Sequence, residues 1–186
     1  MIFSKPSFNM YIITGGPGSG KSTLINALTE RGIQCMPEAG RAIIQDQQAI
    51  GGPALPWVDP GSFAELMLSW DIRSYREGLK LQGPVIFDRG IPDVMGYLRL
   101  NSLPVPPHIE KATQVFRYHP QIFIAPPWQE IFAQDNERKQ SFEEAIATYH
   151  AMVKVYSGLN YEICYLPLSS VEERVEFIMQ RIISSS

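Results

Sequence analysis

The chain has 186 residues, of which 45% are hydrophobic and 19% charged, so a single domain over residues 1–186 can bury a core of its own. A net charge of −3 without any basic run argues against a nucleic-acid partner. No apolar run approaches the roughly 20 residues of a membrane span or the pattern of a secretory signal, so we expect no membrane partner and a cytoplasmic protein.

The first elements are predicted to be a strand, a glycine loop and a helix. Residues 10–14 (MYIIT) form a short apolar run that ends at a glycine cluster, which is typical of a buried parallel strand. Residues 21–31 have apolar side chains at helical spacing, and Gly32 is placed to stop the helix.

A second strand and two more helices follow. Residues 33–36 predict a short strand, and residues 38–50 a helix that stops at a Gly-Gly-Pro turn. Asp59 can cap the next helix, with Pro60 at its first position, and we expect this helix to run to about residue 81.

The second half repeats the alternation. Three apolar runs predict further strands at 84–88, 121–125 and 161–166. The proline-rich stretch 103–108 is expected to connect two helical pieces. We expect further helices at 129–136, at 141–156 and from residue 171 onward, the last one opened by a capping box of Ser170 and Glu173. Five strands alternating with helices predict an α/β fold, a five-stranded parallel sheet with helices on both faces in three layers.

The segment GGPGSGKST, which begins at Gly15, fits the P-loop pattern and lies between a predicted strand and a predicted helix. Its glycines let the backbone curve around phosphates, and the N–H groups at the helix N-terminus attract the anion. We expect Lys21 to reach the β- and γ-phosphates of ATP or GTP, and Ser22 to offer its hydroxyl to Mg²⁺. The predicted ligands of the nucleotide are Gly16, Pro17, Gly18, Ser19, Gly20, Lys21, Ser22 and Thr23. The alternative is a glycine-rich turn that binds nothing, which the strand and helix context argues against.

Carboxylates follow two of the predicted strands. Asp88 ends the run PVIFD, where a P-loop enzyme needs an acid to organise Mg²⁺, and Arg89 and Asp93 lie within one turn of it. Helix capping is the alternative role for Asp88 and for Asp93. Glu38 follows the second strand and can accept a proton from a hydroxyl or hold the metal's water shell; its alternative role is to complement a helix dipole. The predicted metal ligands are therefore Ser22 and Asp88.

Two further groups complete the predicted site. Arg138 lies in a segment, about 127–140, that we expect to act as a lid whose cation neutralises charge on the transferring phosphoryl group, unless it is a charged surface turn. Arg41, Trp57 and Asp93 are candidate acceptor ligands; solvent exposure is the alternative for Arg41, and core packing is the common fate of tryptophan. The predicted catalytic residues are Lys21, Glu38, Asp88, Arg89 and Arg138.

The motifs GGPGSGKST, PEAGR, FDRGIPD, DNERKQSFEEA and SVEERVEFI, in this order, resemble a group of P-loop ATPases with an AAA-type label, related to the ribosylnicotinamide kinase domain of the NAD-biosynthesis regulator. The resemblance covers nearly the whole chain. It implies a nucleoside or nucleotide kinase architecture, a lid around 135–139, and the acid Glu38 as base or substrate ligand. No run of apolar residues ends in two acids, so we expect a monomer or small homo-oligomer and not an AAA+ ring.

We therefore expect a small-molecule kinase that transfers the γ-phosphoryl group of ATP·Mg²⁺ to a nucleoside-like or other small acceptor. One alternative is a nucleotide-dependent switch or binding module, although the sequence has no guanine-reading N-K-x-D run. Another is a plain NTPase without an acceptor.

Overall fold

In the computed structural model, which describes residues 9–132 and 140–184, five parallel strands form one sheet. The sheet order is β2-β3-β1-β4-β5, so β1 lies in the centre and pairs with β3 and β4. Its first four residues are at most 1% exposed because helices cover both faces, which explains the continuous apolar run. The strands are β1 (Met10–Gly15), β2 (Gln34–Met36), β3 (Val85–Asp88), β4 (Gln121–Ala125) and β5 (Glu162–Tyr165).

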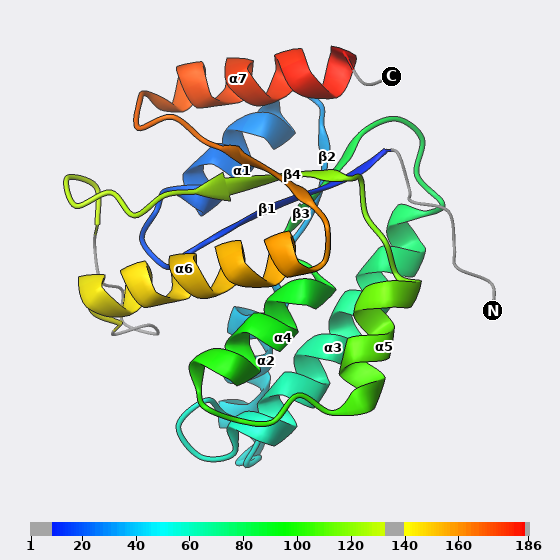
Figure 1. Ribbon diagram of the computed structural model, residues 1–186, viewed down its shortest axis with the longest axis vertical. Helices are drawn as coiled ribbons and strands as arrows, with labels where there is room; N and C mark the ends of the chain where they lie inside the picture. The colour runs from blue at the N-terminus through cyan, green and yellow to red at the C-terminus, as the bar shows by residue number, and fades with distance from the viewer. Residues whose placement is uncertain (1–8, 133–139, 185–186) are drawn as a thin grey trace.

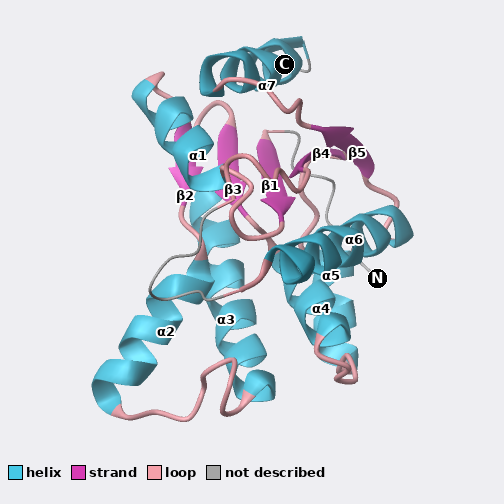
Figure 2. Cartoon of the chain, turned by 90° about the vertical axis from the view of Figure 1, so that its left-hand side faces the viewer, coloured by secondary structure: helices cyan, strands magenta, loops and turns pink. Residues whose placement is uncertain are grey.

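Seven helices accompany these strands in the described part of the chain. They are α1 (Lys21–Glu30), α2 (Ala39–Ile50), α3 (Pro60–Gly78), α4 (Ile91–Leu100), α5 (Pro107–Val115), α6 (Phe142–Gly158) and α7 (Val171–Ser184). Helices α1 and α7 cover one face of the sheet, and α6 lies with α4 against the other (Figure 1). Helices α2 and α3 extend beyond the sheet (Figure 2). Residues of these two helices and of their connection form a smaller apolar cluster.

The predicted α/β fold is confirmed, with each strand within two residues of its expected position. The expected caps form as well: Asp59 accepts a hydrogen bond from the Ser62 N–H at 2.9 Å, and Ser170 and Glu173 exchange the two bonds of a capping box. None of the described helices is long and apolar enough to cross a membrane.

Two helix predictions need correction. The helix expected to reach residue 81 ends at Gly78, where the chain turns back toward β3. The helix expected at 129–136 is absent over 129–132, where residues 129–131 form a turn after the two prolines that follow β4; the rest of that prediction lies outside the described residues. Helical spacing in so short a segment does not outweigh the turn that the prolines favour.

A buried carboxylate joins the sheet to two helices. Asp93, in the first turn of α4, is 6% exposed and accepts hydrogen bonds from the hydroxyls of Thr14 in β1 and Tyr156 in α6. It also accepts from the Gly90 N–H at 3.0 Å, which caps α4, and from Arg89 at 3.4 Å. Four donors thus surround one carboxylate, which has about four lone-pair sites to offer. These interactions favour the helix-capping alternative for Asp93, and its contact with an acceptor stays a prediction.

We predict that Asp93→Ala lowers the free energy of unfolding by about 3 kcal/mol, because it leaves buried donors from β1 and α6 without an acceptor. Chemical denaturation monitored by circular dichroism measures this, with Asp46→Ala on the exposed face of α2 as the control. A loss below about 1 kcal/mol, within the range of an ordinary surface change, would contradict the role assigned to Asp93.

Candidate active site

The P-loop connects β1 to α1 at the carboxyl edge of the sheet. Gly18 and Gly20 have φ angles of 67° and 80°, in the left-handed region that favours glycine. A Cβ atom at Gly15 would lie 2.5 Å from the carbonyl oxygen of Ala125 in β4, and one at Gly16 would collide with the backbone of Ala145 in α6. Side chains at these positions are therefore excluded, and the loop backbone can curve with its N–H groups toward an anion.

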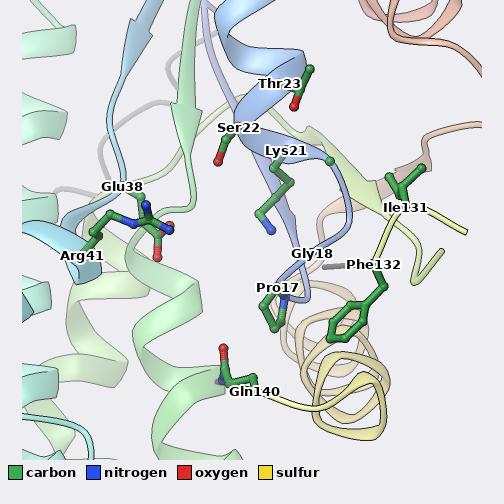
Figure 3. A pocket seen from close by; sticks show the side chains of 11 residues that line it. Pro17, Gly18, Lys21, Ser22, Thr23, Glu38, Arg41, Ile131, Phe132 and Gln140 are labelled. Atoms are coloured by element: carbon green, nitrogen blue, oxygen red, sulfur yellow. The ribbon is translucent and has the colours of Figure 1, made fainter. Parts of the chain in front are cut away.

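Lys21 lies folded over the loop that it follows. Its side chain is buried, and its ammonium group donates to the carbonyl oxygen of Gly16 at 2.7 Å and to the Ser19 hydroxyl at 3.4 Å. Ser22 and Thr23 are exposed beside it on the first turn of α1. The Lys21 ammonium thus lies within the loop that is expected to hold phosphates (Figure 3).

A cavity of about 220 Å³ opens in front of this loop. Glu38 and Arg41 line it from the β2–α2 side, whereas Ile131 and Phe132 line it from the segment after β4 (Figure 3). The other lining residues are Pro17, Gly18, Gly20, Lys21, Ser22, Thr23 and Gln140. The cavity therefore brings the P-loop together with two of the acidic and basic residues singled out in the sequence.

The first residues of the predicted lid lie against the P-loop. A Cβ atom at Gly18 would approach the ring of Phe132 to 2.6 Å, and one at Gly20 would lie 3.0 Å from Ile131. The ring of Phe132 packs edge-on against Phe142 at the start of α6, with centroids 5.3 Å apart. Sequence reasoning placed cations in this lid and missed these apolar contacts. Arg138 lies outside the described residues, so its catalytic role stays a prediction.

Carboxylates and one guanidinium gather where β2 and β3 end. The Nε atom of Arg89 lies 3.3 Å from an Oε atom of Glu38, and its Nη1 atom lies 3.4 Å from Asp93. Burial lowers the pKa of Arg89, but the neighbouring carboxylates outweigh this effect and hold that pKa above its ordinary value. Arg89 is therefore a fixed charge that holds Glu38 beside the P-loop cavity.

Asp88 has the features expected of a magnesium ligand. Its Oδ1 atom is buried and has no hydrogen-bond partner among the described residues. Burial, with Glu38, raises the pKa of Asp88, while Lys21 and Arg89 act in the opposite direction. Mg²⁺ takes oxygen ligands, commonly one or two carboxylates completed by phosphates and water. The unpartnered Asp88 oxygen and the exposed Ser22 hydroxyl fit such a site.

A second cavity, of about 500 Å³, adjoins the first, since Pro17, Glu38 and Gln140 line both. Trp57, expected in an acceptor site, lines it and is 59% exposed. Arg89 and Asp93 lie on its wall as well. The aromatic and acidic residues chosen from sequence thus surround one space next to the P-loop.

Asp71 in α3 and Tyr97 in α4 also line this cavity. Burial and the nearby carboxylates of Asp93 and Glu38 raise the pKa of Asp71 well above its ordinary value. The sequence analysis missed Asp71. A signal was present, because Asp71 falls one helical turn after Met67 and two turns after Phe63, where it interrupts the apolar stripe of its helix.

Arg174 supports the P-loop from behind. It lies in α7 and is 2% exposed, and its Nη1 atom donates to the carbonyl oxygen of Ser19 at 3.1 Å. A Cβ atom at Gly20 would approach the same nitrogen to 2.8 Å. Burial lowers the pKa of Arg174. The last helix therefore fixes the P-loop through one guanidinium, a contact that sequence spacing does not reveal.

We predict that Arg174→Met weakens binding of ATP·Mg²⁺ roughly tenfold, because the Ser19 carbonyl loses a charged donor while the apolar volume is kept. Calorimetric titration with a non-hydrolysable ATP analogue measures the affinity. Arg181→Met is the matched control, since this arginine lies on the same helix over the ring of Phe177, 3.4 Å from its centroid. Equal affinity in the two variants would contradict the positioning role.

Comparisons with known proteins give a family and a fold for this chain. A family model described as an AAA domain matches residues 10–174. A search of curated proteins found no match. A deoxyadenosine kinase from M. mycoides, solved with dCMP and a flexible dCDP, is 14% identical with a TM-score of 0.66, over 94% of this chain and 99% of the kinase.

Two further solved structures share the fold. NadR in complex with NR is 18% identical with a TM-score of 0.68, over 96% of this chain and 49% of NadR. Shikimate kinase from Acinetobacter baumannii, in complex with shikimate, is 14% identical with a TM-score of 0.53, over 97% of this chain and 96% of the enzyme. At such low identity these likenesses establish a P-loop kinase fold and leave the substrate open. Because the family model spans most of the chain, the protein belongs to this AAA-domain family.

Proposed function

We propose that this protein is a kinase that transfers the γ-phosphoryl group of ATP·Mg²⁺, or of GTP·Mg²⁺, to a small acceptor such as a nucleoside. The observation that carries the proposal is that the two cavities adjoin and share Pro17, Glu38 and Gln140 in their walls. The smaller one lies at the P-loop, the larger one has the size of a small-molecule site, and Glu38 lines both. A hydrolase that uses only water has no need of the second space.

In the proposed reaction, an acceptor hydroxyl oxygen forms a bond to the γ-phosphorus while the bond from that phosphorus to the β,γ-bridging oxygen breaks and the nucleoside diphosphate leaves. Glu38, held by Arg89, orients the hydroxyl and takes its proton. Lys21 swings from the Gly16 carbonyl to the β- and γ-phosphates. Ser22 and Asp88 would hold Mg²⁺, which supplies positive charge against the phosphate oxygens.

The charged side chains in the two cavities favour phosphoryl transfer over nucleotide binding alone. The cavities bring carboxylates, the P-loop lysine and a fixed guanidinium to one edge of the sheet, where they can stabilise developing charge without rearrangement. A switch protein requires only the nucleotide and a partner surface. The two alternatives, a binding module and a plain NTPase, differ from a kinase in their response to added acceptor.

We predict that ATP consumption with Mg²⁺ rises in the presence of one acceptor from a panel of nucleosides, nucleotides and other small hydroxyl compounds. Lys21→Ala should reduce this stimulated rate roughly 100-fold or more, because the phosphoryl oxygens lose a preorganised cation. The control is Lys80→Ala, an exposed residue after α3, which should react at the parent rate.

Binding of ATP without stimulation by any compound would contradict the kinase and favour the binding module. Steady hydrolysis that no compound accelerates would favour the plain NTPase. A folded Lys21→Ala variant with undiminished turnover would show that the chemistry lies elsewhere.

A further inference from the structure

The charges on the wall of the larger cavity are unequal. Among the described lining residues, Glu38, Asp93 and Glu144 carry carboxylates, and Asp71 carries a carboxyl group whose pKa is raised, whereas Arg89 is the one cation. Arg89 is already paired with Glu38 at 3.3 Å and with Asp93 at 3.4 Å. An acceptor with a phosphate or carboxylate group would therefore meet like charge in this cavity, and repulsion of this kind is a common source of specificity.

Asp71 has oxygen atoms to offer to a ligand. Its side chain is partly exposed, and no hydrogen bond to its carboxyl group comes from the described residues. The buried acid nearby, Asp93, has four donors around it. A partly exposed carboxyl group on a cavity wall has acceptor oxygens free for a ligand hydroxyl or amino group. Asp71 is thus suited to accept a hydrogen bond from an acceptor molecule.

Tyr97 offers a second unmatched polar atom in the same cavity. Its hydroxyl is buried without a hydrogen-bond partner among the described residues, and its ring packs edge-on against Phe63 with centroids 5.5 Å apart. Burial raises the pKa of Tyr97 to about 12, so the hydroxyl stays protonated and can both donate and accept. Its ring is fixed by packing, and only its hydroxyl lacks a partner.

The remaining wall is apolar enough to take a ring. Trp57, Phe63 and Met67 line the cavity from the α2–α3 connection and α3, and Val94 and Met152 line it from α4 and α6. Ligand pockets are commonly built in this way, with apolar walls and a few placed polar groups that fix orientation. A matching ligand has a flat or apolar ring together with hydrogen-bond donors.

We propose that the larger cavity selects an uncharged, ring-bearing acceptor with several hydroxyl groups, of the nucleoside class, and discriminates against acceptors that carry a phosphate or carboxylate. Asp71 and Tyr97 are the specificity-determining residues: Asp71 accepts a hydrogen bond from an acceptor hydroxyl, and the Tyr97 hydroxyl pairs with a second polar atom. This inference rests on the proposed kinase function and adds the acceptor class to it.

The test is calorimetric titration of the full chain, loaded with a non-hydrolysable ATP analogue and Mg²⁺. The probes are adenosine, guanosine, cytidine, uridine and their deoxy forms, each beside its 5′-monophosphate, and shikimate as a carboxylate. At least one nucleoside is expected to bind roughly tenfold more tightly than its monophosphate and than shikimate.

Two substitutions test the residues themselves. Asp71→Leu and Tyr97→Phe are each expected to weaken binding of that nucleoside, roughly tenfold for Asp71→Leu and roughly fivefold for Tyr97→Phe. The matched controls are Asp46→Leu, on the exposed face of α2, and Tyr165→Phe, whose side chain is half exposed on β5. Both controls should bind the nucleoside as the parent does.

A stability measurement separates this role from a structural one. The pKa of Asp71 is higher in the folded chain than in the unfolded chain, so ionisation destabilises the fold above the unfolded pKa, and Leu removes that cost. Tyr97→Phe removes a hydroxyl that has no partner. Both variants should therefore unfold at a temperature at least as high as the parent, despite their weaker nucleoside binding.

Tight binding of a monophosphate or of shikimate would overturn the inference, as would undiminished nucleoside binding by Asp71→Leu or no nucleoside binding at all. In these cases the kinase itself still stands if an anionic acceptor stimulates ATP consumption and Lys21→Ala abolishes the effect. Failure of the parent to bind ATP·Mg²⁺ would overturn the kinase, and with it the acceptor class.

Discussion

The candidate active site depends on one chain of paired charges that begins at a buried carboxylate in the core. Asp93 is held by Thr14 from the central strand and by Tyr156 from α6, and it pairs with Arg89, which in turn pairs with Glu38. Removing any of these three charged groups from water without a partner would cost free energy, and each ion pair offsets part of that cost. The position of Glu38 at the P-loop cavity is therefore set by packing between the sheet and α6, far from Glu38 in sequence.

The P-loop is constrained from three directions. Gly15 and Gly16 lie so close to Ala125 and Ala145 that β4 and α6 form a wall behind the loop, and Arg174 fixes the Ser19 carbonyl from α7. A loop made largely of glycine would otherwise lose much conformational freedom on binding phosphates. Because of these contacts, the loop loses its conformational freedom when the domain folds. It therefore loses less when a nucleotide binds.

Sequence reasoning succeeded where structure depends on neighbours along the chain. The apolar run that ends at the glycine loop, the P-loop motif and the caps at Asp59 and Ser170 are local patterns, and all of these elements form as predicted. Arg174 was missed because nothing in its own helix distinguishes a buried polar residue from a surface one. Asp71 interrupts an apolar stripe, but the stripe alone does not show which residues it faces. Their significance appears only when α7 meets the P-loop and α3 meets the β2–β3 edge, which are tertiary contacts.

The distribution of charge between the two cavities suits the two substrates of the proposed kinase. Lys21 and Arg41 line the smaller cavity, where the phosphates are expected, whereas the larger cavity has an excess of carboxylates. Glu38 lines both, so it lies at the boundary where an acceptor hydroxyl would meet the γ-phosphate. In the proposed kinase, the anionic phosphoryl donor would be attracted to the smaller cavity and repelled from the larger one, which favours its binding at the P-loop. The P-loop lies at the smaller cavity, whereas Asp71 and Tyr97 belong to α3 and α4, so the two cavities take their character from different parts of the chain.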